Sequence, residues 1–186
     1  MTNQTQRFER LAALYARMDE AWEAGAAHYG FVCRGCADNC CETEFYHYTY
    51  IERHYLLSGL ETLPLPDVET IKEKAKAACA ARDGAKPAER PVRVMCPLNS
   101  NDLCQLYKFR PMICRLHGIP HELKKPGASP VRQPGCADGT PLFNAATYFI
   151  FDRTPIYTEM AKLEMEYRSS TGNRTGIKLT IAEMLS

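Results

Sequence analysis

The sequence has no hydrophobic run long enough to cross a membrane, and it has no excess of either charge. Its 23 Lys and Arg residues nearly balance its 22 Asp and Glu residues, which gives a formal net charge of +1. A nearly neutral chain offers no electrostatic reason to expect nucleic acid or an anionic membrane as a partner. The first residues also lack the apolar core of a secretory signal. We therefore expect a cytoplasmic protein that binds neither nucleic acid nor membrane.

Motifs that mark common catalytic sites are missing as well. The sequence contains no H-E-x-x-H zinc-protease motif, no phosphate-binding glycine loop and no dinucleotide-binding fingerprint. Whether the protein is an enzyme is therefore left open by its sequence.

Cysteine, in contrast, is abundant, with nine residues in the chain. Four of them fall within the segment 33–41, which has too few apolar side chains to be fixed by burial. Cys33 and Cys36 form a Cys-x-x-Cys pair, which places two sulfurs on one side of a turn, as in tetrathiolate sites and iron–sulfur clusters. The neighbouring side chains of Cys40 and Cys41 are expected to diverge. This predicts ligands for two different centres, or for two irons of one cluster.

The downstream cysteines bring the number of candidate ligands to eight, enough for two four-thiolate sites. These candidates are Cys33, Cys36, Cys40, Cys41, Cys96, Cys104, Cys114 and Cys136. In a reducing compartment, clustered cysteines are more often metal ligands than disulfides. His117 or His121 could replace one sulfur, since imidazole binds the same metals. Cys79 lies in an Ala-rich helical pattern and is predicted to be a small buried side chain.

Apolar residues at helical spacing predict two long flanking helices. The first spans about 3–29 and is ended by Gly30, and the second spans about 154–171 and is ended near Gly172. The fold class we predict is mainly α with a small irregular or β-hairpin cysteine-rich metal-binding core. The chain is expected to form a single compact domain, 1–186, with the metal-binding core at 33–136.

Within the core region we expect short elements. Helices are predicted from Ile51 to Leu57, stopped by Gly59, and from Asp67, as a capping residue, to about Arg82. A strand at 92–95 is predicted to pair with 104–107, and a short helix should follow Pro111. The segment 124–141 is predicted to be a loop without regular structure.

The spacing around the later cysteines resembles a known family. Cys96-Pro-Leu, Cys104-x-x-Tyr107 and Arg110-Pro111-x-x-Cys114-Arg115, after the clustered cysteines, resemble the YkgJ-type cysteine-cluster family. That family is described as a zinc- or iron-chelating domain and is named for its CxxCxxCC signature. The resemblance covers roughly 33–136 and implies metal chelation. One departure is that three residues, 37–39, separate the second and third cysteines. A flagellin lysine methylase carries a similar cluster, but this sequence shows no SAM-binding pattern, so that activity is not carried over.

Soft thiolates select zinc, copper(I) or iron–sulfur clusters. The Cys96-Pro97 step and the adjacent Cys40–Cys41 pair slightly favour an iron–sulfur cluster or iron, with zinc as the alternative. Arg34, Arg110 and Arg115 are expected to offset part of the thiolate charge.

The predicted function is a cytoplasmic protein that binds iron–sulfur clusters, or zinc or iron, in a metal-handling, redox or cluster-dependent role. One alternative is a zinc-stapled structural or interaction module without catalytic activity. A less favoured alternative is an exported protein with four disulfides.

Overall fold

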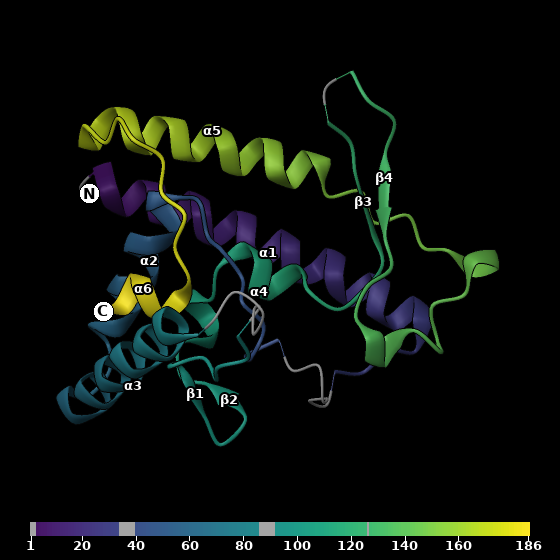
Figure 1. The fold of residues 1–186 in the computed structure, drawn as a ribbon. Coiled ribbons are helices and arrows are strands. Elements are labelled where there is room, and N and C mark those ends of the chain that lie inside the picture. The colour runs from purple at the N-terminus through teal and green to yellow at the C-terminus, as the bar shows by residue number, and fades with distance from the viewer. Residues whose placement is uncertain (1–2, 34–39, 86–91, 126) are drawn as a thin grey trace. The chain divides into compact units, whose positions relative to one another are not determined.

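The computed structural model describes residues 3–33, 40–85, 92–125 and 127–186 (Figure 1). By its internal contacts the chain divides into two compact units. Unit 1 comprises Met1–Asp38 and Cys114–Gly172, and unit 2 comprises Asn39–Ile113 and Asn173–Ser186. The chain therefore passes from one unit to the other three times. The prediction of a mainly α fold with small β elements is confirmed, and the single domain over 1–186 stays a prediction.

Unit 1 contains the two long helices that the sequence predicts. Helix α1 spans Asn3–Tyr29 and helix α5 spans Thr154–Thr171. Each is followed by a glycine in the left-handed region, Gly30 with φ 64° and Gly172 with φ 73°. A residue with a Cβ adopts this conformation only at a cost, so glycine ends both helices where expected.

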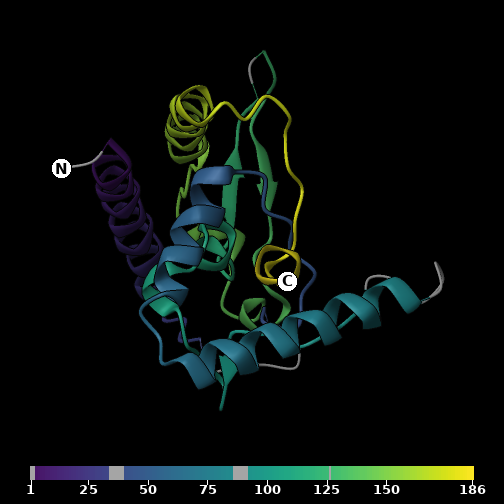
Figure 2. The same cartoon turned by 90° about the vertical axis from the view of Figure 1, so that its left-hand side faces the viewer.

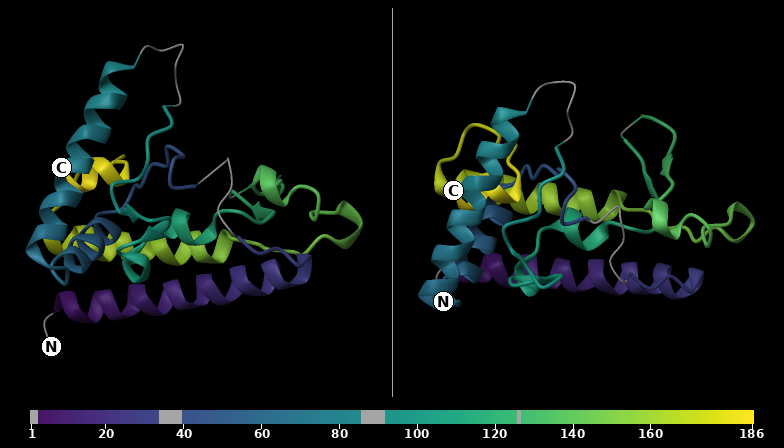
Figure 3. Two further views of the ribbon diagram at one scale, coloured as in Figure 1. Left: turned by 90° about the horizontal axis from the view of Figure 1, so that it is seen from below. Right: turned by 60° about the horizontal axis from the view of Figure 1, so that its bottom comes forward.

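Helices α1 and α5 lie side by side and antiparallel (Figures 1 and 3). Arg10 in α1 pairs with Glu166 in α5 at 2.5 Å, and Arg17, further along α1, pairs with Glu159, earlier in α5. The buried apolar side chains of these two helices are Leu11, Leu14, Tyr15, Met18, Ala26, Tyr29, Ile156, Met160, Leu163 and Tyr167. They form the helical core of unit 1.

The shorter elements of unit 1 follow helix α4, which spans Met112–Leu116, crosses the unit boundary and begins right after Pro111, as predicted. Strand β3, His121–Leu123, pairs antiparallel with strand β4, Val131–Gln133. The prediction that 124–141 lacks regular structure is therefore wrong at β4. Three exposed residues carry too little apolar pattern to indicate a strand.

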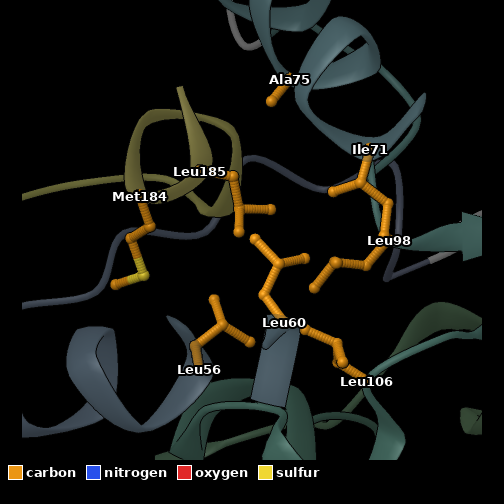
Figure 4. Close-up of a cluster of buried hydrophobic side chains, with 8 residues drawn as sticks. All are labelled: Leu56, Leu60, Ile71, Ala75, Leu98, Leu106, Met184 and Leu185. Carbon is orange, nitrogen blue, oxygen red and sulfur yellow. The ribbon is translucent and has the colours of Figure 1, made fainter. Parts of the chain in front are cut away.

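Unit 2 is built from α2 (Tyr50–Leu60), α3 (Leu65–Gly84) and α6 (Ile181–Leu185). Helix α6 packs against α3 (Figure 2). The shared core consists of Leu56, Leu60, Ile71, Ala75, Leu98, Leu106, Met184 and Leu185 (Figure 4). Two of these residues, Leu98 and Leu106, come from the cysteine-rich segment, so this segment is anchored in the apolar core of unit 2.

Three local predictions for unit 2 need correction. Gly59 lies inside α2 and does not stop it; a Cβ there would collide with the ring of Phe109, so glycine is used for close packing. Asp67 lies in the first turn of α3, which begins two residues earlier, after Pro64. The hairpin is tighter than predicted: β1 is Asn99–Ser100 and β2 is Leu103–Cys104, with no strand at 92–95.

None of the helices in the described residues combines the length and the apolar character that crossing a membrane requires.

Candidate metal centre

A tight hairpin in unit 2 brings two candidate ligands together. Asn99 pairs with Cys104 across β1 and β2, and the turn residues Asn101 and Asp102 have φ of 52° and 63°. Positive φ at both central residues is the geometry of a two-residue hairpin turn, and Asn and Asp tolerate it best among residues with a side chain. Because Asn99 N–H also donates to the carbonyl oxygen of Cys96 at 2.9 Å, Cys96 and Cys104 flank the same end of the hairpin.

The thiol of Cys96 lies in an environment that suits a metal-bound thiolate. Its pKa is raised to about 12, chiefly by burial and in part by the nearby thiols of Cys41 and Cys104, against hydrogen bonds from the backbone of Leu98 and Asn99 that act to lower it. A hydrogen bond that lowers a thiol's pKa favours the thiolate, so these backbone groups are N–H donors. A buried cysteine sulfur that faces N–H groups stays protonated, and therefore neutral, unless a cation replaces its proton. It is well placed to bind one.

Cys40 and Cys41 join this group. The N–H of Cys96 donates to the carbonyl oxygen of Cys41 at 2.7 Å. Hydrogen bonds from the Cys40 thiol and the Asn99 side chain lower the pKa of the Cys41 thiol to about 6, although burial acts to raise it. The expectation that the two neighbouring side chains diverge is wrong, because the two thiols are hydrogen-bonded to each other. The turn at 40–43, closed by Thr43 N–H on the Cys40 carbonyl oxygen at 3.3 Å, accounts for their approach.

Asn99 connects the parts of this site, and the sequence analysis did not single it out. Its Oδ1 accepts the N–H of Asp102 at 3.2 Å, so the side-chain donor to Cys41 is its Nδ2 group. Its carbonyl oxygen accepts from Lys74 Nζ at 3.2 Å. Asn99 is only 9% exposed. An Asn at this place in a cysteine-rich turn is the only signal that could have indicated its role.

In unit 1, three candidate cysteines belong to segments that meet at a turn around Gly118. The N–H of Cys136 donates to the carbonyl oxygen of Gly118 at 2.8 Å. Phe31, two residues before Cys33, lies 3.6 Å from where a Cβ of Gly118 would stand. Cys114 is four residues before Gly118 in the chain. Cys33 is exposed, Cys114 half-buried and Cys136 buried.

The crossing of two chain segments at this turn depends on glycine. Gly135 has φ 83°, and a Cβ on it would lie 2.7 Å from the carbonyl oxygen of Gly118. The turn is enclosed by aromatic side chains: Trp22 Nε1 donates to the carbonyl oxygen of His117 at 2.7 Å, and the ring centroids of Phe31 and Phe143 are 5.5 Å apart.

The remaining candidates are placed as follows. Cys36 and Arg34 lie outside the described residues. Cys79 is half-buried within α3, so it is less buried than predicted. Each of the eight described cysteines is a thiol and not part of a disulfide. Across the described residues, no three Cys, His, Asp or Glu side chains are close enough together to hold a metal ion as they stand. Within each unit, the structure thus brings candidate segments together without closing a coordination sphere among the described residues.

His121 belongs to unit 1 and is neutral at physiological pH. Burial, followed by the charge of Arg153, lowers the pKa of His121 to about 4. Its Nδ1 lies 3.4 Å from the carbonyl oxygen of Ile119. A neutral imidazole retains the lone pair that a metal needs, so its replacement of a sulfur ligand stays a prediction, as does that of His117.

Arg110 and Arg115, the two described arginines expected to offset thiolate charge, have other contacts. Arg115 pairs with Asp19 at 2.5 Å and stacks on Tyr15, so Asp19 already balances its charge. The guanidinium of Arg110 lies 3.6 Å from the ring centroid of Tyr107. The sequence analysis missed Arg153, which is 2% exposed and donates to the Leu116 carbonyl oxygen. Its position just before α5 gave no sign of burial.

Comparison with known proteins agrees with this cysteine chemistry. No curated protein and no solved structure matches the chain. The model of the CxxCxxCC family, described as "Putative zinc- or iron-chelating domain", matches residues 32–132, which is more than half of the chain. This range includes seven of the eight candidate ligands and stops four residues before Cys136. The chain therefore belongs to the CxxCxxCC family.

Proposed function

We propose that this protein binds iron, as an ion or as an iron–sulfur cluster, or zinc, through the eight clustered cysteines Cys33, Cys36, Cys40, Cys41, Cys96, Cys104, Cys114 and Cys136. The observation that carries the proposal is the arrangement in unit 2. There the Cys96 thiol receives backbone hydrogen bonds and lies beside Cys41 and Cys104. Directed N–H groups around a buried sulfur are what a thiolate ligand requires when a cation replaces its proton.

The donor set favours soft metals. Thiolates select zinc, copper(I) and iron–sulfur centres over hard cations, which prefer oxygen. The Cys96-Pro97 step favours iron or an iron–sulfur cluster slightly. Thiolate ligands must also stay reduced, which supports a location in a reducing compartment such as the cytoplasm. With iron, the centre would serve metal handling, redox chemistry or a cluster-dependent reaction.

A second candidate function, a zinc-stapled structural or interaction module, is favoured by two observations. The Cys40 and Cys41 thiols approach each other as two ligands of one ion do, and Cys96 and Cys104 pack against the apolar core of unit 2. Metal binding there would hold a hairpin against that core, as structural zinc does in small domains.

Purification without oxygen, followed by metal and sulfide analysis and a visible spectrum, tests both candidates. Brown protein that contains iron and sulfide supports a cluster, and coloured protein with iron but no sulfide supports an iron site. Colourless protein with bound zinc supports the stapled module. Protein that is folded, reduced and unable to bind either metal on reconstitution contradicts the proposal.

A further inference from the structure

Two of the three boundaries between the units fall within the cysteine pattern. The first boundary, between Asp38 and Asn39, separates Cys33 from Cys40. The second, between Ile113 and Cys114, separates the hairpin cysteines from Cys114. The fold therefore sorts the described candidate ligands into two groups, with Cys40 to Cys104 in unit 2 and Cys33, Cys114 and Cys136 in unit 1. Cys36 lies outside the described residues and is assigned to neither group.

We propose that unit 2 contains a complete thiolate metal centre of its own, made by Cys40, Cys41, Cys96 and Cys104, and that Cys33, Cys114 and Cys136 of unit 1 serve a second centre. This inference rests on the proposed function and deepens it, because it assigns ligands to separate sites.

In unit 2, the four cysteines are linked to one another, some through their side chains and some through their backbone. The Cys40 and Cys41 thiols are hydrogen-bonded to each other. The N–H of Cys96 is bonded to the carbonyl oxygen of Cys41 at 2.7 Å, and the Cys41 and Cys104 thiols are close enough to affect Cys96 electrostatically. Four thiols within one interaction network are the number that a tetrahedral site needs.

Adjacent cysteines in one centre are compatible with this geometry. Two sulfurs on a tetrahedral ion are about 3.8 Å apart when each metal–sulfur bond is about 2.3 Å long. Hydrogen-bonded thiols have a comparable separation. A single ion can therefore accept both Cys40 and Cys41 if their side chains keep the approach that the structure shows.

The backbone of the unit 2 centre is anchored by the apolar core. Leu98 and Leu106 are each 2% exposed, and they follow Cys96 and Cys104 by two residues in the chain. Gln105 N–H donates to the carbonyl oxygen of Leu98 at 2.9 Å. Because these neighbours are anchored in the core, the backbone beside the thiols has little conformational freedom to lose when the ligand set closes.

In unit 1, the cysteines share the Gly118 turn and no partner from the unit 2 network is needed to bring them together. Cys136 is tied to Gly118 by its N–H at 2.8 Å. The segment that leads to Cys33 packs against the same turn through Phe31, and Cys114 begins the stretch that leads into it. The segments that carry these three cysteines thus approach the same turn within one unit.

Reconstitution with Co²⁺ tests this assignment, since its thiolate complexes absorb in the visible and near-ultraviolet range. The matched variants are Cys104→Ser in unit 2, Cys136→Ser in unit 1, and Cys79→Ser as a control outside both groups. We expect each of the first two variants to lose about half of the metal bound by the unaltered protein. The double variant should lose nearly all of it, and Cys79→Ser should lose none. Complete loss in either single variant, or full retention in Cys104→Ser, would overturn the assignment.

Alkylation of the unaltered full chain provides a test that needs no variant to fold. Reduced protein is titrated with Co²⁺ below saturation, pulsed with iodoacetamide and mapped by mass spectrometry. Two centres predict that Cys40, Cys41, Cys96 and Cys104 become protected together, with a different metal dependence from Cys33, Cys114 and Cys136. Simultaneous protection of all seven thiols would mean a single centre and would overturn the assignment alone. If no thiol is protected at saturation, the proposed function itself fails.

Discussion

The two units position their cysteines by different means. In unit 2, backbone hydrogen bonds hold Cys41 to Cys96 and the hairpin, and an aliphatic core anchors the residues beside them. In unit 1, the segments that carry cysteines meet at a glycine crossing enclosed by aromatic rings. The arrangement in unit 2 depends on apolar side chains, and the crossing in unit 1 depends on glycines, Gly118 and Gly135, which have no side chain. Substitutions that affect one should therefore spare the other.

The largest effect is expected from truncating the core next to the hairpin. Leu98→Ala removes a side chain that is 2% exposed, and such a substitution lowers the free energy of unfolding by roughly 2–5 kcal/mol. Urea denaturation of the reduced protein measures this loss. The variant should also bind less metal in unit 2, while Cys136 stays protected from alkylation by bound metal.

Leu103→Ala in the same hairpin is the matched control, because Leu103 is 73% exposed. A change within about 0.5 kcal/mol is expected there. Equal effects of the two substitutions would mean that the core does not anchor the hairpin.

The next effect concerns the glycine crossing of unit 1. Gly135→Ala introduces strain in two ways. It places a side chain on a residue with φ 83°, and the new Cβ would lie 2.7 Å from the carbonyl oxygen of Gly118. Strain of this kind costs roughly 2–3 kcal/mol, because backbone atoms must move apart. Thermal unfolding and protection of Cys136 should both decrease, with the unit 2 thiols unaffected.

Gly172→Ala separates backbone strain from collision. Gly172 has φ 73°, but among the described residues no atom lies within 4 Å of the position that a Cβ would take. Its substitution should cost only about 1 kcal/mol. If Gly135→Ala is no worse than Gly172→Ala, the close approach of the two segments is not essential.

A smaller effect is expected from the side chain that hydrogen-bonds Cys41. Asn99→Asp keeps the acceptor for Asp102 N–H but replaces the Nδ2 donor with a carboxylate that repels a thiolate. Loss of such a supporting hydrogen bond typically weakens metal affinity by about tenfold or more. Competition with a chromophoric chelator measures it. Lys74→Ala, which removes a contact to the Asn99 carbonyl oxygen only, should change affinity by less than about twofold, and an equal loss in both variants would point to a purely structural effect.

The smallest effect is expected from two ion pairs, one in each unit, that differ in their exposure to solvent. In unit 2, the pKa of Glu183 is lowered to about 2 from its ordinary value of 4.5. The main cause is the hydrogen bond from Arg82, and burial acts in the opposite direction. A lowered pKa stabilises the fold above pH 4.5, and this stability is lost as the pH falls towards 2. Glu183→Gln should therefore cost about 1 kcal/mol at neutral pH, allowing for solvent screening, and almost nothing near pH 2. Urea midpoints measured across this range test it.

Glu166→Gln in unit 1 provides the contrast. Glu166 pairs with Arg10, and both side chains are about half exposed. The hydrogen bond from Arg10 lowers the pKa of Glu166, so we expect a pH dependence of the same sign as for Glu183→Gln, but a smaller one because solvent screens the exposed pair. A pH dependence as strong as that of Glu183→Gln would show that exposure does not distinguish the two pairs.

The long elements could be predicted from sequence because their signals are local. The apolar spacing of α1 and α5 and the glycines that end them need no knowledge of the rest of the fold. The position of Pro111 predicted α4 in the same way. The prediction that Gly59 stops α2 was wrong because glycine there serves packing against Phe109, fifty residues later in the chain. Such a long-range contact gives no signal in the residues next to Gly59 in the sequence.

The candidate ligands could be identified from residue type and spacing, but their grouping could not. Nothing in the spacing separates Cys33 from Cys40 or Cys104 from Cys114, because the separation arises where the chain passes between units. The same limit applies to Asn99, whose role depends on a hydrogen bond to Cys41, and to Arg153, whose burial depends on the packing of unit 1. The approach of Cys40 to Cys41 likewise depends on a turn that spacing does not specify.

The placement of α6 has a consequence for biosynthesis. Met184 and Leu185 fill the core of unit 2, yet in chain order they follow every residue of unit 1. During translation, unit 1 can be fully synthesised while the apolar surface beside the hairpin thiols is still uncovered. Unit 2 would therefore complete its core after unit 1 has been synthesised, although Cys40 to Cys104 precede Cys114 and Cys136 in the chain. Metal that is delivered early would meet the unit 2 thiols before Met184 and Leu185 complete the core beside them.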